Sequence, residues 1–129
     1  MKILKFGETS LGSSHRIKNI IPLINNNDKK IVVLSAISGT TNHLERFVEL
    51  INNKEYSHAK ACLNDLKNKF IELGNGLFHK KDYLEICNDI INDHFSFIET
   101  YANENINVFQ KKIIILQILR TTSRLLILI

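Results

Sequence analysis

The sequence predicts one α/β domain in which a parallel βαβ unit is followed by a helical hairpin. Two short apolar runs have the length and composition of buried strands, residues 2–6 (KILKF) and 31–34 (IVVL). Ser13 and Ser14 offer an N-cap to the segment between them, where isoleucines recur at helical spacing: Ile17, Ile20, Ile21 and Ile24. A strand, a helix that Pro22 is expected to kink and a second strand form a right-handed crossover over a parallel sheet.

The rest of the chain is predicted to be helical. Thr40 or Thr41 is the expected N-cap of a helix with one apolar face: Leu44, Phe47, Val48 and Ile51. Two longer apolar stripes follow and predict an antiparallel hairpin. The first spans residues 56–73 and is stopped by the Gly74-Asn75-Gly76 run, and the second passes through Leu84, Cys87, Ile90, Ile91, His94, Phe97, Ile98 and Tyr101. Residues 1–53 would hold the βαβ unit, its loops and one helix, residues 54–104 the hairpin, and residues 105–129 an apolar, basic tail.

The formal net charge of +4 does not indicate a nucleic-acid-binding protein, because of where the charges lie. All 13 acidic residues lie at or before Glu104, and residues 1–105 contain 13 Lys and Arg, so this part is neutral. The excess comes from the tail alone: Lys111, Lys112, Arg120 and Arg124. Nucleic acid is therefore not an expected partner.

Cysteine and histidine spacing predicts neither a disulfide framework nor a metal site. Cys62 and Cys87 are 25 positions apart without a CxxC pair, and the five histidines form no HxxxH or HExxH pattern. Each thiol falls on an apolar stripe and is expected to be a small buried hydrophobic group. The N-terminus has no signal-peptide pattern, so a cytoplasmic location is expected.

Residues 106–129 are apolar on every side of a predicted helix. Arg120 and Arg124 interrupt the apolar run, so insertion into a membrane is not expected. A helix of this kind is usually buried in a larger core, and no later residue covers it here. We therefore expect a fragment of a larger domain that self-associates through residues 106–129.

Small and hydroxyl-bearing residues follow both predicted strands. Residues 5–10 (KFGETS) place a lysine, a glycine turn and two hydroxyls together, which suits phosphate oxygens. Residues 35–42 (SAISGTTN) repeat the theme, and ligands of open α/β sheets bind at the carboxyl ends of strands. The alternative interpretation is two βα turns that use glycine and serine for tightness and capping, since no Walker A pattern is present.

Residues 2–24 (KILKFGETSLGSSHRIKNIIPLI) and 29–44 (KKIVVLSAISGTTNHL) together closely resemble the N-terminus of aspartate kinases, whose usual motifs are KFGGTSxG and VVxSAxSGxTN. The resemblance covers residues 1 to about 104. It implies an incomplete amino-acid-kinase fold, a three-layer αβα sandwich. It also implies phosphoryl transfer from MgATP to the side-chain carboxylate of L-aspartate, in lysine, threonine and methionine biosynthesis.

Site residues are assigned by the same resemblance. Lys5 would be the catalytic residue that stabilises the transferring phosphoryl group. The ATP phosphates would be bound by Lys5, Phe6, Gly7, Glu8, Thr9, Ser10 and Ser35, and aspartate by Ser38, Gly39 and Thr41. Mg²⁺ would enter with ATP as part of the substrate, with no tightly bound cofactor and no metal-ligating residue in this chain.

Two departures from the family pattern affect the expected activity. Glu8 stands where the family has its second glycine, and it brings a side chain and a negative charge to a place where backbone approaches phosphates. Residues 112–123 (KIIILQILRTTS) contain no glutamate, whereas the family has a glycine-glutamate motif near this position that helps to hold the substrate amino group. The alternatives are therefore an inactive fragment that serves as an interaction or regulatory subunit, and a non-functional truncated product.

Overall fold

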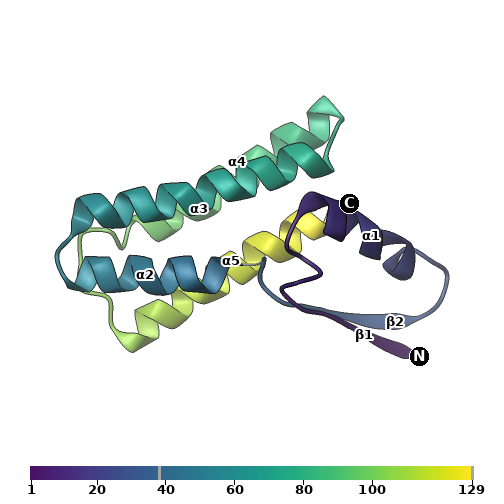
Figure 1. Ribbon diagram of the computed structural model, residues 1–129, viewed down its shortest axis with the longest axis horizontal. Helices are drawn as coiled ribbons and strands as arrows, with labels where there is room; N and C mark the ends of the chain where they lie inside the picture. The colour runs from purple at the N-terminus through teal and green to yellow at the C-terminus, as the bar shows by residue number, and fades with distance from the viewer. Residues whose placement is uncertain (38, 129) are drawn as a thin grey trace.

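A computed structural model describes residues 1–37 and 39–128 of the chain. It is a mixed α/β structure in which a two-stranded parallel sheet and one helix lie at one end and four longer helices pack beside one another (Figure 1). In chain order the elements are β1 (Lys2–Phe6), α1 (Ser14–Ile24), β2 (Lys30–Leu34), α2 (Thr40–Asn52), α3 (Tyr56–Leu77), α4 (Lys81–Glu99) and α5 (Val108–Ile127). The predicted α/β class and the predicted order of strands and helices along the chain are confirmed.

The βαβ unit forms as the sequence predicts. β1 and β2 pair in parallel over their whole length, with Lys2 opposite Lys30 and Phe6 opposite Leu34. α1 begins after Ser13, whose hydroxyl accepts a hydrogen bond from the Arg16 amide at 3.2 Å. The sheet thus brings the carboxyl ends of both strands to one edge, where the two loops of interest begin.

The expectation that both strands are buried is wrong. Ile3 is 70% exposed, Ile31 47% and Val33 44%. The register pairs Ile3 with Ile31 and Lys5 with Val33, so these residues share the sheet face opposite Phe6. α1 covers only the other face, so within the described residues a parallel sheet that is normally covered on both sides has one open face.

The predicted hairpin also forms, and it belongs to a larger helical assembly. α3 and α4 lie side by side, α2 packs on α3, and α5 packs on both α4 and α2 (Figure 1). The side chain of Asn52 holds the start of α5 to the end of α2, accepting from the Ile106 amide at 2.7 Å and donating to its carbonyl at 3.0 Å. α1 contacts α3, which joins the βαβ unit to the helices.

Gly74 and Gly76 do not end a helix, contrary to the prediction, since α3 continues to Leu77. Their role is close packing. A Cβ on Gly74 would lie 2.6 Å from the Cys87 sulfur of α4, and a Cβ on Gly76 would collide with the Ser14 hydroxyl of α1. The glycines therefore let α4 and α1 approach α3, which offsets their poor helix propensity.

The predicted apolar stripe of α4 is confirmed at Cys87, Ile91, His94 and Ile98, which are buried, but it is wrong at Phe97. Phe97 is 42% exposed, whereas Phe95 is 2% exposed and meets Phe70 of α3 edge to face, with ring centroids 5.5 Å apart. Because α4 packs against α3 on one side and α5 on another, its buried surface is wider than one periodic stripe and includes Phe95.

The sequence suggested that the tail helix is uncovered, and this expectation is wrong. α5 buries Ile114, Ile118 and Leu125 in the common core, while Phe109 is 71% and Leu116 59% exposed. α4 and α2 provide the cover on one side. Among the residues that the structure describes, no helix has both the length and the apolar content that crossing a membrane requires.

Candidate functional site

The two glycine- and hydroxyl-containing loops start next to each other. The Ser35 amide, directly after β2, donates to the Phe6 carbonyl at the end of β1 over 3.1 Å. This bond continues the parallel ladder by one residue and sets the starts of the two loops side by side. The two strands are adjacent, so both loops begin at the same edge of the sheet.

The first loop is a tight turn that is open to solvent. The Leu11 amide donates to the Glu8 carbonyl at 3.2 Å, and the Gly12 amide donates to the Thr9 carbonyl at 3.3 Å. Gly7, Glu8 and Thr9 are exposed, and a Cβ on Gly7 would meet nothing within 4 Å. The turn is therefore accessible from solvent, and the exposed Glu8 carboxylate lies within it.

Arg16 is a member of this loop region that the sequence did not single out. Its guanidinium donates to the Thr9 carbonyl over 3.1 Å, from the first turn of α1. In the sequence, the feature that could have indicated Arg16 is its position three residues after the capping Ser13, which places it in the first turn of α1. Arg16 adds a positive charge beside the turn and holds the loop backbone in place.

Lys5 and Phe6 point to opposite faces of the sheet. Lys5 is exposed and shares the open face with its register partner Val33, while Phe6 is 8% exposed and belongs to the core. Phe6 serves the site through its backbone, because its carbonyl accepts the Ser35 amide. The Ser35 hydroxyl is half-buried and donates to the neighbouring Ala36 carbonyl at 3.0 Å.

The second loop leads directly into α2. The N-cap is Gly39, with a left-handed backbone (φ +81°), rather than either threonine, and Ser38 lies outside the described residues. Left-handed geometry strains any residue with a Cβ, which explains a glycine here. Thr41 is half-buried in the first turn, so of the predicted aspartate-binding residues the structure places Gly39 and Thr41 together.

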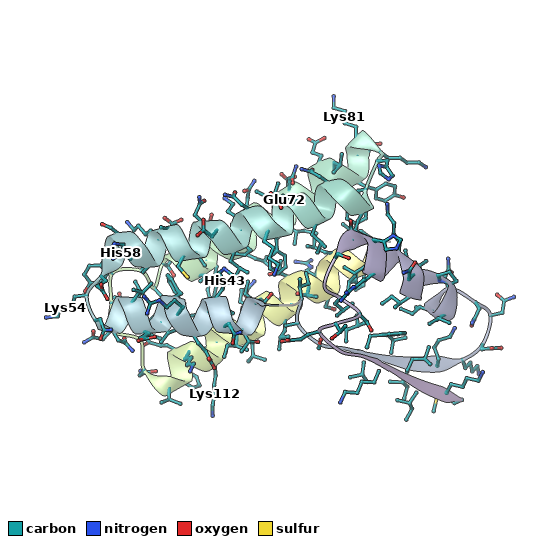
Figure 2. All side chains as sticks on the ribbon, viewed as in Figure 1. His43, Lys54, His58, Glu72, Lys81 and Lys112 are labelled. Carbon is teal, nitrogen blue, oxygen red and sulfur yellow. The ribbon has the colours of Figure 1, made fainter. Side chains whose placement is uncertain are left out.

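Thr40 and His43 complete the start of α2. Thr40 is 1% exposed, and its hydroxyl has no hydrogen-bond partner among the described residues. The His43 ring nitrogen Nδ1 lies 3.0 Å from the Gly39 carbonyl, and the His43 carbonyl accepts a bond from the Cys62 thiol of α3 at 3.4 Å. Figure 2 shows His43 on the side of α2 that faces α3.

Lys69 of α3 also reaches this loop. Its ammonium nitrogen lies 3.0 Å from the place that a Cβ on Gly39 would occupy. Thirty positions separate the two residues along the chain, so no local pattern indicates this approach. The packing of α2 on α3 alone creates it.

The surroundings of the two thiols disfavour the thiolate form. Burial raises the pKa of both the Cys62 and the Cys87 thiols, and Asp65 adds to the rise in the pKa of Cys62. Cys87 is buried as predicted, whereas Cys62 is half-buried. No cluster of three metal-ligating side chains occurs within residues 1–37 and 39–128.

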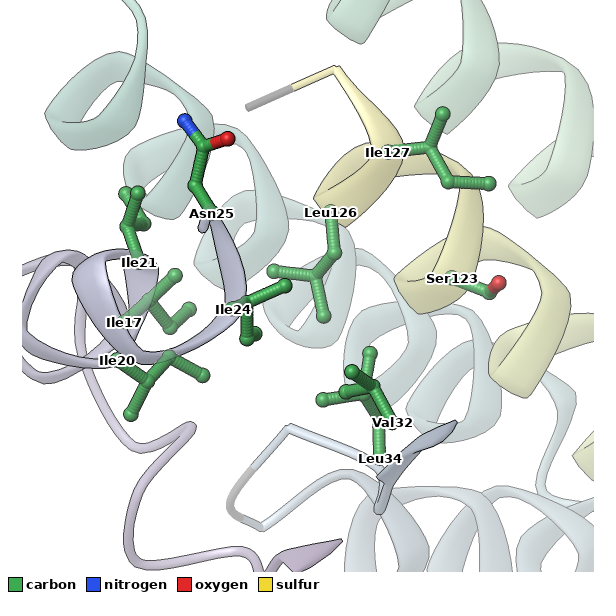
Figure 3. Close-up of a pocket in the computed structure, with 10 residues that line it drawn as sticks. All are labelled: Ile17, Ile20, Ile21, Ile24, Asn25, Val32, Leu34, Ser123, Leu126 and Ile127. Carbon is green, nitrogen blue, oxygen red and sulfur yellow. The ribbon is translucent and has the colours of Figure 1, made fainter. Parts of the chain in front are cut away.

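A separate apolar cavity of about 510 Å³ lies between α1, β2 and the end of α5. Figure 3 shows Ile24, Val32, Leu34 and Leu126 directed toward the shared space. Asn25 and Ser123 are the polar residues that line it, and the predicted phosphate- and aspartate-binding residues lie elsewhere. Its lining suits apolar groups rather than phosphates.

Comparison with known proteins gives one informative similarity. No protein-family model matches the sequence. The chain is 35% identical over 89 residues to a bifunctional aspartokinase/homoserine dehydrogenase from Buchnera aphidicola subsp. Acyrthosiphon pisum (strain APS). The match covers 63% of this chain and 11% of that protein, so the chain spans about a tenth of its relative. This similarity fits an aspartate-kinase-like region.

Proposed function

We propose that this chain carries the phosphate- and aspartate-binding loops of an aspartate-kinase-type module with the amino-acid-kinase fold. The reaction is phosphoryl transfer from MgATP to the side-chain carboxylate of L-aspartate, a step that serves lysine, threonine and methionine synthesis. The observation that carries the proposal is the juxtaposition of two small, hydroxyl-rich loops at the carboxyl ends of paired parallel strands, joined by the bond from Ser35 to Phe6. The partial similarity to an aspartokinase-containing protein supports it.

The chemistry requires positioning and charge stabilisation. A carboxylate is already ionised at neutral pH, so the nucleophile needs no general base. Two anions must approach each other, and cations with oriented amide groups lower the free energy of that approach. In this chain Lys5 supplies the cation, and the exposed turn at Gly7 supplies amide groups. Mg²⁺ arrives with ATP as part of the substrate.

The first loop binds the ATP phosphates, and the second loop binds aspartate. Lys5, Gly7, Thr9 and Ser10 contact the phosphates, and Ser35 lines the ATP side. Ser38, Gly39 and Thr41 hold aspartate at the start of α2. Phe6 positions the first loop from the core, and the Glu8 carboxylate opposes phosphate binding by like-charge repulsion.

Calorimetric titration of MgATP tests the proposal with a pair of lysines from one strand. Lys5→Met removes the proposed phosphate contact, and Lys2→Met removes the same charge at the far end of β1. We expect Lys5→Met to weaken binding about tenfold or more, because a charge-assisted hydrogen bond is lost. Lys2→Met should leave affinity within about twofold. Equal effects of the two substitutions, or no binding by the unchanged chain, would refute the phosphate-loop assignment.

A second candidate function is an inactive interaction subunit. The observation that favours it is the set of exposed apolar side chains on α5: Val108, Phe109, Leu116 and Ile127. Hydroxylamine trapping with ATP and aspartate separates the two functions. Acyl phosphate that disappears in Lys5→Ala supports the kinase, whereas ligand binding without product supports the interaction subunit.

A further inference from the structure

The side of α5 that points away from the core carries apolar and basic residues together. Four residues lie at four-residue spacing and so form one row along the helix: Val108, Lys112, Leu116 and Arg120. Phe109 lies beside this row. The three apolar residues are each more than half exposed, and both basic residues are exposed. These five residues are the outer face of α5.

The outer face of α5 is positively charged, and its charges are not neutralised within the described part of the chain. α5 contains four basic residues and no acidic residue. The ion pairs among the described residues lie on α2 and at the start of α3, so Lys112 and Arg120 take part in none of them. A partner that covers this face must therefore supply negative charge as well as apolar contact.

A second exposed apolar patch lies on the same side of the molecule. The register places Ile3 opposite Ile31 on the sheet face that α1 does not cover, and these side chains are 70% and 47% exposed. In Figures 1 and 2 α1 lies above the sheet, so the open sheet face points downward in the view, and Lys112 lies on the lower side of α5. A planar partner can contact both patches, whereas one helix lying along α5 would cover only one.

A fluid anionic lipid surface matches this combination of shape and chemistry. Apolar and basic side chains alternate along the row, and a lipid interface presents headgroup phosphates directly above acyl chains at every point of its plane. Lysine and arginine can reach the headgroups while the neighbouring apolar side chains enter the acyl boundary. A second copy of the same face would instead bring cations of one sign together at low salt, where they are not screened.

We propose that the outer face of α5 docks on an anionic lipid surface, with the helix lying in the plane of the interface. Only the apolar side chains of this face enter the acyl boundary, and the helix does not cross the membrane. The interaction is independent of the proposed kinase function, because no residue of α5 belongs to either loop.

An introduced tryptophan tests which face meets the lipid, since the chain contains no tryptophan of its own. Phe109→Trp places the indole on the outer face of α5. Tyr83→Trp is the matched control on α4, where the parent side chain is 42% exposed. Each variant is mixed with vesicles of phosphatidylcholine alone, or of equal parts phosphatidylcholine and phosphatidylglycerol, with brominated acyl chains as quenchers.

We expect blue-shifted and quenched fluorescence from Phe109→Trp with the anionic vesicles only, and unchanged fluorescence from Tyr83→Trp with both. Unchanged fluorescence from Phe109→Trp would overturn the proposal. Equal quenching of the two variants would also overturn it, because the contact would then not be specific to α5.

Vesicle co-sedimentation separates the charged and apolar contributions with two matched pairs. Lys112 and Lys81 are both exposed lysines, and Figure 2 shows them at opposite sides of the molecule. Lys112→Gln should weaken partition into anionic vesicles about fivefold, and Lys81→Gln should change it by less than about twofold. Leu116→Ser should weaken partition about fivefold or more, whereas Ile86→Ser, at a 44% exposed position of α4, should leave it within about twofold. Circular dichroism identifies the variants that remain folded.

Salt and alternative partners complete the test on the unchanged chain. Partition should weaken when salt rises from about 0.1 M to about 1 M, because the Debye length falls from about 10 Å to about 3 Å. Equal partition into neutral and anionic vesicles would overturn the proposal. Binding to poly-glutamate without binding to vesicles would assign the face to an acidic protein, and self-association at low salt without binding to vesicles would assign it to a second copy. Either result would overturn the lipid assignment.

Discussion

The contact that joins α5 to α4 yields a sharp stability prediction. His94 Nδ1 lies 2.6 Å from the Thr121 hydroxyl oxygen, and the two residues are 7% and 0% exposed. Thr121 donates its only hydroxyl proton to the Gln117 carbonyl at 2.9 Å, so it accepts from an N–H at Nδ1 of His94. Thr121→Val removes the acceptor while keeping the side-chain shape.

The expected loss follows from the burial of both partners. A buried N–H left without an acceptor costs about 1–3 kcal/mol, so Thr121→Val should lower the free energy of unfolding by that amount. Thr122→Val is the matched control. Thr122 is 2% exposed and donates only to the Ile118 carbonyl at 3.1 Å, so its loss strands no other buried group and should cost less than about 1 kcal/mol.

Urea unfolding followed by circular dichroism at pH 7.5 measures both variants. A lower urea midpoint for Thr121→Val alone, with an unchanged dependence of the unfolding free energy on urea concentration, would support the reasoning. That dependence reports the surface exposed on unfolding, so an unchanged value means that only stability has changed. Equal destabilisation by the two substitutions would refute it, since both remove a hydroxyl bonded to the preceding helical turn. In that case the His94 contact would contribute nothing measurable.

Four further outcomes follow from particular contacts. Burial, reinforced by nearby arginines, lowers the pKa of His94 below its ordinary 6.5, so the unfolded chain binds a proton more readily than the folded chain. The free energy of unfolding should therefore keep its full value above about pH 6.5 and decrease as the pH falls below it. The difference between the urea midpoints at pH 7.5 and 5.5 should be smaller in His94→Gln than in the unchanged chain. Gly74→Ala should lower the free energy of unfolding by about 1–3 kcal/mol because the new methyl group overpacks against the Cys87 sulfur, and a gain of about 1 kcal/mol in helix propensity should offset part of this loss. In a double-mutant cycle Cys87→Ala should relieve the clash, and additive effects of the two substitutions would contradict this explanation. Glu8→Gly should tighten MgATP binding in calorimetry by removing a like charge from the exposed turn, and weaker or unchanged affinity would argue against a phosphate there. Self-association in sedimentation should persist in high salt and decrease in Leu116→Lys, whose parent residue is 59% exposed, whereas a chain that is monomeric at low and high salt would exclude an adhesive α5 surface.

Local chemistry along the chain was enough to predict the βαβ unit. Residues 2–6 and 31–34 are short apolar runs, Ser13 caps the helix between them, and each of these signals acts within a few residues. The positions of the two loops at neighbouring strand ends followed from this unit, because parallel strands place their carboxyl ends at one edge. The roles of the loop residues remain predictions.

Tertiary packing decided what local signals misjudged. Gly74 lies inside α3 because α4 brings Cys87 against it, and Phe95 rather than Phe97 is buried because α4 has neighbours on two sides. Periodicity indicates that a helix has an apolar face, but the width and centre of that face depend on which helices pack against it.

Propensities and caps that act over a few positions were sufficient to specify the strand–helix–strand unit, the helical hairpin and the two loops. Only the tertiary structure brought Lys69 to Gly39, joined His94 to Thr121 and left one sheet face open. These contacts join residues about 30 positions apart, and their geometry arises from the packing of whole helices, which no short sequence pattern encodes.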